Sequence, residues 1–181
     1  LAGHVRAALH FGAWTFTPGV RHERIDLSRV DYESDLDRAS DGTERTNDVV
    51  VWLPGLGAHV DVVPGLWTAF AGVHRGFVPP GSAPETEAEF STNVEVGSRL
   101  STRALSGQIT LFHSDHINLL GADLTASGGT GSGDQFNGGS SRARGVEFEA
   151  VGDVLELTGA SAFFPDGKFH LPVRTSYTFT E

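Results

Sequence analysis

Residues 49–77, VVVWLPGLGAHVDVVPGLWTAFAGVHRGF, decide the fold, because they predict two strands joined by a tight turn at Val63-Pro64-Gly65. The even positions of the first strand form an unbroken apolar row: Val50, Trp52, Pro54, Leu56, Ala58, Val60 and Val62. The odd positions end in Gly55, Gly57, His59 and Asp61. Side chains alternate across a strand, so one face is fully apolar and the other mixes glycine with charge. Globular strands usually have about 5 to 6 residues. The longer row here matches the roughly 9 to 11 residues of a tilted strand that crosses a bilayer.

The composition excludes several classes of protein. The 181 residues contain no cysteine, which removes disulfide scaffolds, thiolate metal sites and cysteine catalysis. A net charge of -10, with Lys168 as the only lysine, argues against a nucleic-acid partner. No window approaches the ~18 apolar residues of a membrane helix, so any membrane contact would be made by strands. Because the chain lacks methionine and starts at Leu1 without a signal-like segment, we expect an excised piece with native neighbours on both sides.

The alternation predicts an all-β antiparallel meander of about eight strands: Val5–Phe16, Val20–Tyr32, a strand from Val49, Leu66–Val78, Asn93–Thr102, Gln108–Ile117, Arg142–Val151 and Phe169–Thr180. Tight turns are expected at 17–19, 63–65 and 103–106, and long polar loops at 33–47, 79–89 and 118–141. The poor alternation in 20–32 leaves a bulge and an exit from the apolar layer as alternatives. The connection 152–168 is compatible with an extra hairpin whose apolar part is Leu155, Leu157 and Phe163-Phe164.

Tight turns and long loops alternate strictly over the first six strands. Outer-membrane barrels show this asymmetry, because their periplasmic turns are short and their outward loops are long. The turns near Pro18, Pro64 and Leu105 are therefore expected on the periplasmic side.

Several stretches resemble the TonB-dependent outer-membrane receptors, in particular their ferric citrate transporter-like branch. They are WTFTPGVR (14–21), WLPGL (52–56), FAGVHRGFVPP (70–80), NVEVG (93–97), FNGG (136–139), RARGVE (142–147), LPVR (171–174) and YTFT (177–180). They follow the family's order and rough spacing across nearly the whole chain. The chain departs from the family at Val94, where an aromatic residue is usual, and in the length of the 152–168 connection.

The resemblance implies a transmembrane β-barrel of about 22 strands filled by a plug domain. It implies import of ferric citrate or another ferric siderophore, driven by the TonB complex, across the outer membrane of a Gram-negative bacterium. Residues 1–181 would form part of that barrel, without the plug domain and the terminal strands. Implied partners are the ferric chelate, the TonB complex through the missing plug, and outer-membrane lipid and lipopolysaccharide. The resemblance implies no enzyme activity and no cofactor other than the transported chelate.

An anionic chelate requires positive, bidentate donors, which arginine supplies best. Candidate ligand residues are Arg38 and Arg45 in the first long loop, and His74 and Arg75 near the outer end of their strand. The alternatives for the arginines are binding of lipopolysaccharide phosphates, pairing with the many acidic residues, and simple solvation. Arg142 and Arg144 share the face of Val146 and Phe148, so lipid headgroups are their expected contact.

Four aromatic residues are candidates for an aromatic girdle: Trp14, Trp52, Trp67 and Tyr177. We expect Trp14 and Trp67 at the periplasmic rim, and Trp52 and Tyr177 toward the outer rim. No metal site is expected at His113-Ser114-Asp115-His116, because a strand splits these side chains between two faces. No catalytic site is expected there either, because no nucleophile-elbow pattern frames Ser114.

Two other classes of protein remain open at this point. A soluble β-sandwich binding module would bury the row from Val50 to Val62 under a second sheet. A receptor of the same family that signals would carry an N-terminal extension. The sequence does not identify the chelate.

Overall fold

A computed structural model describes residues 1–32, 42–83, 85–124, 129, 133–164 and 169–181. Its strands are β1 (Ala2–Arg6), β2 (Leu9–Phe11), β3 (Trp14–Asp31), β4 (Thr43–Val63), β5 (Trp67–Val78), β6 (Glu89–Ser101), β7 (Leu105–Ile117), β8 (Leu120–Ala122), β9 (Gln135–Asn137), β10 (Ser140–Asp153) and β11 (Pro172–Thr180). Its two short helices are α1 (Val154–Thr158) and the 3-10 turn η2 (Ala160–Phe163). No helix in these residues is long and apolar enough to cross a membrane.

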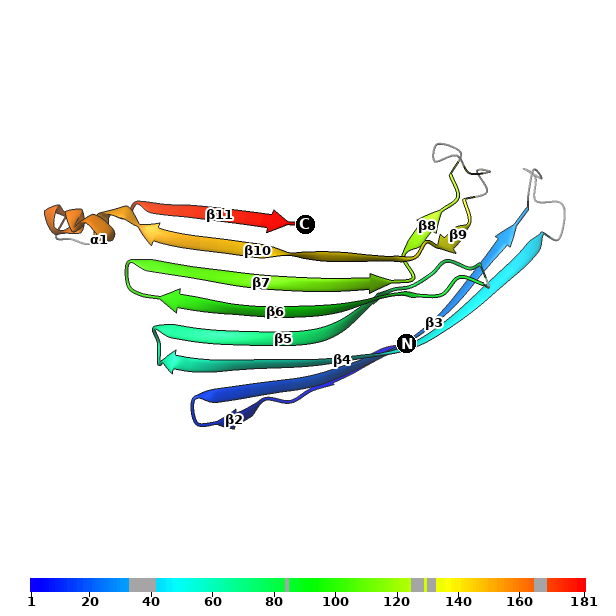
Figure 1. Ribbon diagram of the computed structural model, residues 1–181, viewed down its shortest axis with the longest axis horizontal. Helices are drawn as coiled ribbons and strands as arrows, with labels where there is room; N and C mark the ends of the chain where they lie inside the picture. The colour runs from blue at the N-terminus through cyan, green and yellow to red at the C-terminus, as the bar shows by residue number, and fades with distance from the viewer. Residues whose placement is uncertain (33–41, 84, 125–128, 130–132, 165–168) are drawn as a thin grey trace.

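The main sheet is an antiparallel meander in the order β1-β3-β4-β5-β6-β7-β10-β11. Strand β2 pairs with β3 and continues the line of β1, so the nine strands occupy the eight predicted positions. In Figure 1 the tight turns lie at the left end of the sheet, and the long connections lie at the right. We call these the turn end and the loop end. The predicted fold class and the alternation of connections are confirmed.

The sheet forms a single layer with two different faces. The face of Trp52 and Leu56, here the outer face, continues through the directly paired Val73 and Val94. Leu56 is 47% exposed and Val50 is 57% exposed. The only buried hydrophobic residues in the described part of the chain are Val49, Val51 and Ala88. No second sheet covers the apolar row in this part of the chain, which contradicts the sandwich alternative.

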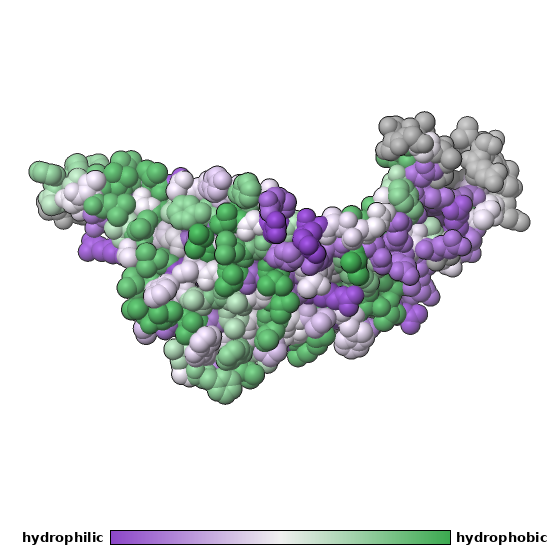
Figure 2. Space-filling model, viewed as in Figure 1, coloured by the Kyte–Doolittle hydropathy of each residue, from purple (hydrophilic) through white to green (hydrophobic). Residues whose placement is uncertain are grey.

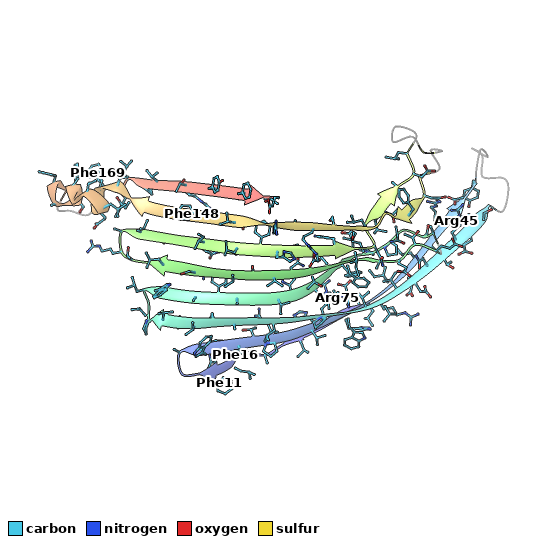
Figure 3. All side chains as sticks on the ribbon, in the orientation of Figure 1. Phe11, Phe16, Arg45, Arg75, Phe148 and Phe169 are labelled. Atoms are coloured by element: carbon cyan, nitrogen blue, oxygen red, sulfur yellow. The ribbon has the colours of Figure 1, made fainter. Side chains whose placement is uncertain are left out.

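The opposite face, here the inner face, carries Gly55, Gly57 and His59 of β4, which pair directly with His74, Gly72 and Phe70 of β5. A second division, between hydrophobic and hydrophilic residues, runs along the strand direction from the turn end to the loop end. Figure 2 shows hydrophobic residues concentrated toward the turn end and hydrophilic residues over the loop end. Labelled side chains in Figure 3 follow the same division, with Phe11 and Phe16 near the turn end and Arg45 at the loop end.

The first predicted turn is wrong. The chain reverses at Gly12-Ala13, where Gly12 has a φ of 59°, and β3 runs straight through Pro18. Pro18 has no N–H to donate, so the ladder on that side is interrupted. The gap between β1 and β2 lies at this point, where the Ala7 N–H still donates to the Pro18 carbonyl oxygen at 3.0 Å.

The poor alternation in 20–32 reflects an exit from the apolar layer. Strands β3 and β4 keep one unbroken register from Trp14↔Val60 to Asp31↔Thr43, with no bulge between them. Their outer part extends beyond the rest of the sheet as a two-stranded ribbon (Figure 1). The first long loop is therefore shorter than predicted, because Thr43 and Arg45 already belong to β4.

Two other connections differ from the prediction. The loop 118–141 contains the hairpin β8–β9. The connection 152–168 contains α1 and η2 in place of an extra hairpin. The Asp153 carboxylate caps α1 by accepting hydrogen bonds from the N–H groups of Leu155 and Glu156, and Gly159 ends the helix with a φ of 74°. Such capping starts a helix where hydrophobic alternation alone suggested a strand.

Candidate ligand-binding site

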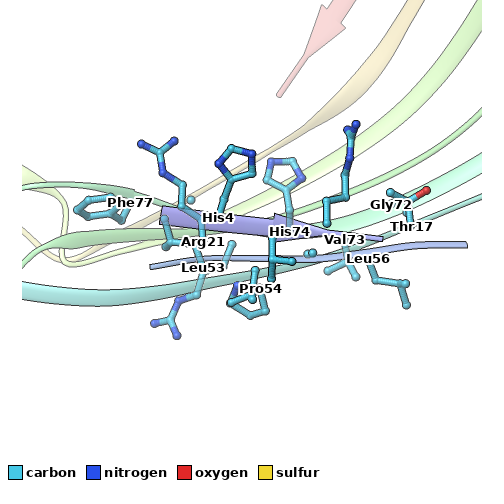
Figure 4. A pocket seen from close by; sticks show the side chains of 18 of the residues that line it. His4, Thr17, Arg21, Leu53, Pro54, Leu56, Gly72, Val73, His74 and Phe77 are labelled. Atoms are coloured by element: carbon cyan, nitrogen blue, oxygen red, sulfur yellow. The ribbon is translucent and has the colours of Figure 1, made fainter. Parts of the chain in front are cut away.

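The sheet forks where β4 and β5 separate. Their pairing ends at Gly55↔His74, beyond which β4 continues with β3 and β5 continues with β6. An open hollow of about 790 Å³ lies at this fork, bordered by β1, β3, β4, β5 and Glu95 of β6. In Figure 4 the rings of His4 and His74 lie on one side of the strands, and Pro54 and Leu56 lie on the other. Side chains on both faces of the sheet therefore line the hollow.

Glycines form the floor of the hollow on the inner face. Gly19 pairs with Gly55, and Gly57 pairs with Gly72 through the continuous register of β3, β4 and β5. A Cβ atom on Gly55 would lie 3.2 Å from Cβ of His74, closer than side chains normally pack. Glycine lets a ligand or another backbone approach the strand closely.

Basic side chains stand around this floor. His4 of β1 pairs directly with Arg21 of β3, and Arg6 follows on the same face. Arg21 forms an ion pair with Glu23. Among the described residues, the side chains of His4 and Arg6 have no hydrogen-bond or ion-pair partner. These exposed donors can bind the oxygen atoms of an anionic ligand.

A second cluster of charges lies at the loop end and is here named the ion network: Arg29, Asp31, Arg45 and Asp134. Arg29 Nη2 lies 2.8 Å from Asp134 Oδ1, and Arg45 Nη1 lies 3.0 Å from Asp134 Oδ2. Both arginines also contact Asp31, through their Nε atoms at 2.7 Å and 3.1 Å. The hydrogen bonds from Arg29 and Arg45 hold the pKa of the Asp134 carboxyl below its usual range.

Side-chain hydrogen bonds join the loops next to the ion network to one another and to β4. Asn47 Nδ2 donates to the carbonyl oxygens of Ala83 and Thr86, both at 3.0 Å. The Thr86 hydroxyl donates to the Gln135 carbonyl oxygen at 2.9 Å, and Asn137 Nδ2 donates to the Glu87 carbonyl oxygen at 3.0 Å. The β3–β4 ribbon, the 79–88 loop and the β8–β9 hairpin therefore form one connected surface.

The four predicted ligand residues are not brought together. Arg38 lies outside the described residues, and Arg45 belongs to the ion network. His74 and Arg75 both border the hollow, but the register places them on opposite faces. The guanidinium carbon of Arg75 lies 4.2 Å from the centre of the Phe90 ring, a cation–π geometry. Of the four, only His74 points to the inner face at the hollow.

The four aromatic girdle candidates all lie on the outer face and are exposed, from Trp67 at 42% to Trp52 at 61%. The register places Tyr177 in the same cross-strand row as Trp14, through Phe148, Ile109, Ser98, Ala69 and Val60. From the sequence we expected Tyr177 to lie with Trp52 toward the loop end. The register instead places it in the row of Trp14.

Charged residues replace apolar ones at the loop end of the outer face. Arg142 Nε lies 2.7 Å from Asp115 Oδ1, and His113 Nε2 lies 3.0 Å from Asp115 Oδ2. Arg144 pairs with Glu181. His116 instead contacts Glu89 from the other face, so the strand divides this histidine pair as its alternation predicts. The described residues contain no group of three side chains able to hold a metal ion.

The sequence reasoning missed His4, Arg6 and Arg21 at the hollow. A signal for them existed, because strict alternation puts Arg6 opposite the apolar row of Val5 and Leu9. Arg29 and Asp134 were also missed, and they had no such signal, since 105 residues separate them in the chain.

Residues 2–181 match the protein family described as TonB dependent receptor-like, beta-barrel. The structure is similar to the FrpB iron transporter of Neisseria meningitidis, with a TM-score of 0.71 and 16% identity over 99% of this chain and 25% of that chain. It is similar to the ferric citrate transporter FecA in its unliganded form, with a TM-score of 0.70 and 22% identity over 99% of this chain and 26% of that chain. It is also similar to the siderophore receptor PirA of Pseudomonas aeruginosa, with a TM-score of 0.59 and 17% identity over 99% of this chain and 42% of that chain. No curated protein sequence matches the chain significantly. The chain thus spans about a quarter of the length of the first solved structures that it matches.

Proposed function

Because the chain belongs to the TonB-dependent receptor-like β-barrel family, we propose that it forms barrel wall in a Gram-negative outer-membrane receptor that imports a ferric chelate. In this role it catalyses no reaction and holds no resident cofactor. The energy would come from the TonB complex, acting through a plug domain outside residues 1–181.

One observation carries the proposal: a single-layer sheet exposes an apolar outer face and carries glycine and charge on its inner face. A sheet with such faces is stable where lipid covers one side and water the other. We assign the turn end to the periplasm and the loop end to the outside, by the rule of short turns and long loops. The outer-face aromatic residues would then form the girdle, and Arg142 and Arg144 would lie near lipopolysaccharide.

The ligand would be ferric citrate or another anionic ferric siderophore. Support comes from solved structures of similar fold, which include an iron transporter, a ferric citrate transporter and a siderophore receptor. Inner-face donors at the hollow favour His74, Arg6 and Arg21 over Arg75 as ligand contacts. Arg45 would act within the ion network. The role of Arg38 as a ligand contact stays a prediction.

The test is uptake of radioactive iron by a Gram-negative host that lacks its own ferric-chelate receptors and expresses the gene product containing residues 1–181. Ferric citrate, a ferric catecholate and a ferric hydroxamate are supplied separately. We expect uptake of at least one chelate, and its loss in the same host without TonB. If none of the chelates is bound or taken up, the proposed ligand class is wrong. If uptake persists without TonB, the proposed energy source is wrong.

A further inference from the structure

The connection between β10 and β11 exposes large apolar side chains to an unusual degree. Phe163 is 83% exposed, and four further residues are also exposed: Leu157, Phe164, Phe169 and Leu171. We call α1, η2, Phe164, Phe169 and Leu171 the foot. In Figure 1 α1 extends from the turn end of β10, and Figure 3 labels Phe169 beside it.

The foot lies on the outer-face side of the sheet. Gly152 pairs directly with Leu105 of β7 and with Val173 of β11, which belong to the outer face. A Cβ atom on Gly152 would lie 2.9 Å from Cδ1 of Leu157 and 3.5 Å from Cδ1 of Leu105. Leu157 therefore lies over Gly152, and the apolar surface of the sheet continues into the foot.

The described charged residues in and beside the foot are paired. Asp153 accepts hydrogen bonds from the Leu155 and Leu171 N–H groups at 3.0 Å and 3.3 Å, and its other oxygen contacts His170 Nδ1 at 2.7 Å. Glu156 is the only charged residue in 154–164, and Oε1 of Glu156 pairs with Arg103 at 3.3 Å. What remains exposed is mainly apolar, including the Phe164 and Phe169 rings, whose centres are 4.9 Å apart.

We propose that the foot inserts its apolar side chains into the phospholipid leaflet at the turn end, at the boundary between headgroups and acyl chains. The inference rests on the proposed function, because the outer face must itself contact lipid. We choose lipid as the partner of the foot because the apolar outer face, which faces lipid in the proposed function, continues into the foot beyond the ends of β10 and β11. Short segments with aromatic residues on one side and polar groups on the other bind at this boundary.

The test uses spin labels on single cysteines, since these 181 residues contain none. The gene product, with any other cysteine replaced by serine, is reconstituted in phospholipid vesicles. Labels are placed by Phe163→Cys, by Arg103→Cys at the exposed β6–β7 turn as the water-facing control, and by Val96→Cys on the outer face of β6 as the lipid-facing control. Relaxation by oxygen, which partitions into lipid, is compared with relaxation by an aqueous nickel chelate.

We expect the label at position 163 to favour oxygen over nickel severalfold more than the label at 103 does, at a shallower depth than the label at 96. If position 96 contacts lipid but position 163 is as open to nickel as position 103, the foot proposal fails and the proposed function stands. Protection of position 163 from both reagents would show a protein occupant, a second copy or another partner, and would overturn the lipid contact. If position 96 itself is open to nickel, the membrane placement of the sheet fails, and the foot proposal fails with it.

Discussion

The ring of Phe112 lies across Gly145, its direct partner on the neighbouring strand, so closely that a Cβ atom on Gly145 would lie 2.7 Å from Cζ of Phe112. Phe70 covers Gly97 in the same way on β5 and β6. An aromatic ring over a strand glycine fixes the register and compensates for the missing side chain. Two such pairs on the inner face tie β5 to β6 and β7 to β10.

Gly145→Ala should lower the free energy of unfolding by about 1 to 3 kcal/mol, because the added methyl group would overlap the backbone carbonyl oxygen of Phe179 and overpack against the Phe112 ring. The matched control is Gly57→Ala on the same face, whose Cβ would lie 3.9 Å from its nearest neighbour. Denaturant titration of the reconstituted gene product measures both variants. Equal losses at the two positions would show that the close contacts at Gly145, with the Phe179 carbonyl oxygen and the Phe112 ring, are not the cause.

Leu56→Arg should block assembly into the membrane, because a charge on the lipid face near the bilayer midplane costs about 2 to 4 kcal/mol. His59→Arg on the inner face of the same strand is the control and should assemble normally. The measurement is the amount of folded protein in the outer-membrane fraction. The reverse result, with only His59→Arg excluded, would mean that the two faces are assigned the wrong way round.

Asp134→Asn should loosen the contact between the β8–β9 hairpin and the β3–β4 ribbon, because it removes the carboxylate shared by Arg29 and Arg45. Spin labels at Val30 and Ala122 report the distance between the two elements. We expect a broader distance distribution in the variant. Asp48→Asn on the outer face of β4 serves as the control and should leave the distribution unchanged.

Acidification should also loosen the contact between the β8–β9 hairpin and the β3–β4 ribbon. The folded-state pKa of Asp134 lies below its unfolded value, because Arg29 and Arg45 donate hydrogen bonds to the carboxylate. The stabilisation is therefore fully present above the ordinary carboxyl pKa and is lost as the pH falls through the lower folded value. In the wild type, the label distribution should broaden only on strong acidification. Broadening near neutral pH would exclude Asp134 as the titrating group.

Arg6→Gln should weaken chelate binding by about 1 kcal/mol, roughly a fivefold rise in Kd, because it removes an inner-face cation at the hollow. Arg75→Gln is the control with an equal loss of charge on the outer face. Binding is measured by quenching of tryptophan fluorescence in detergent. A larger effect at Arg75 would mean that the ligand reaches the hollow through the fork from the other face.

Sequence alternation predicted the architecture well because lipid and water impose a period of two on every strand. It misplaced the first turn, since Thr17-Pro18-Gly19 has turn composition but Pro18 lies within β3, where the ladder beside it is interrupted. It also left room for a hairpin where Asp153 and Gly159 cap a helix. Local composition cannot decide the position of the turn, because the deciding partner is on another strand.

By itself, the sequence determined an antiparallel meander whose strands have one apolar and one polar face, because the identity of each side chain and its parity suffice to assign it to a face. Only the tertiary structure showed that no second sheet covers the apolar row in the described residues. The fork between β4 and β5, the ion network that joins Arg29 to Asp134, and the outer-face position of Leu157 were decided only by the tertiary structure. These features depend on where distant strands part and meet. The positions where strands separate or come together are set by hydrogen-bond pairing across the whole sheet, and no single segment of the sequence encodes them.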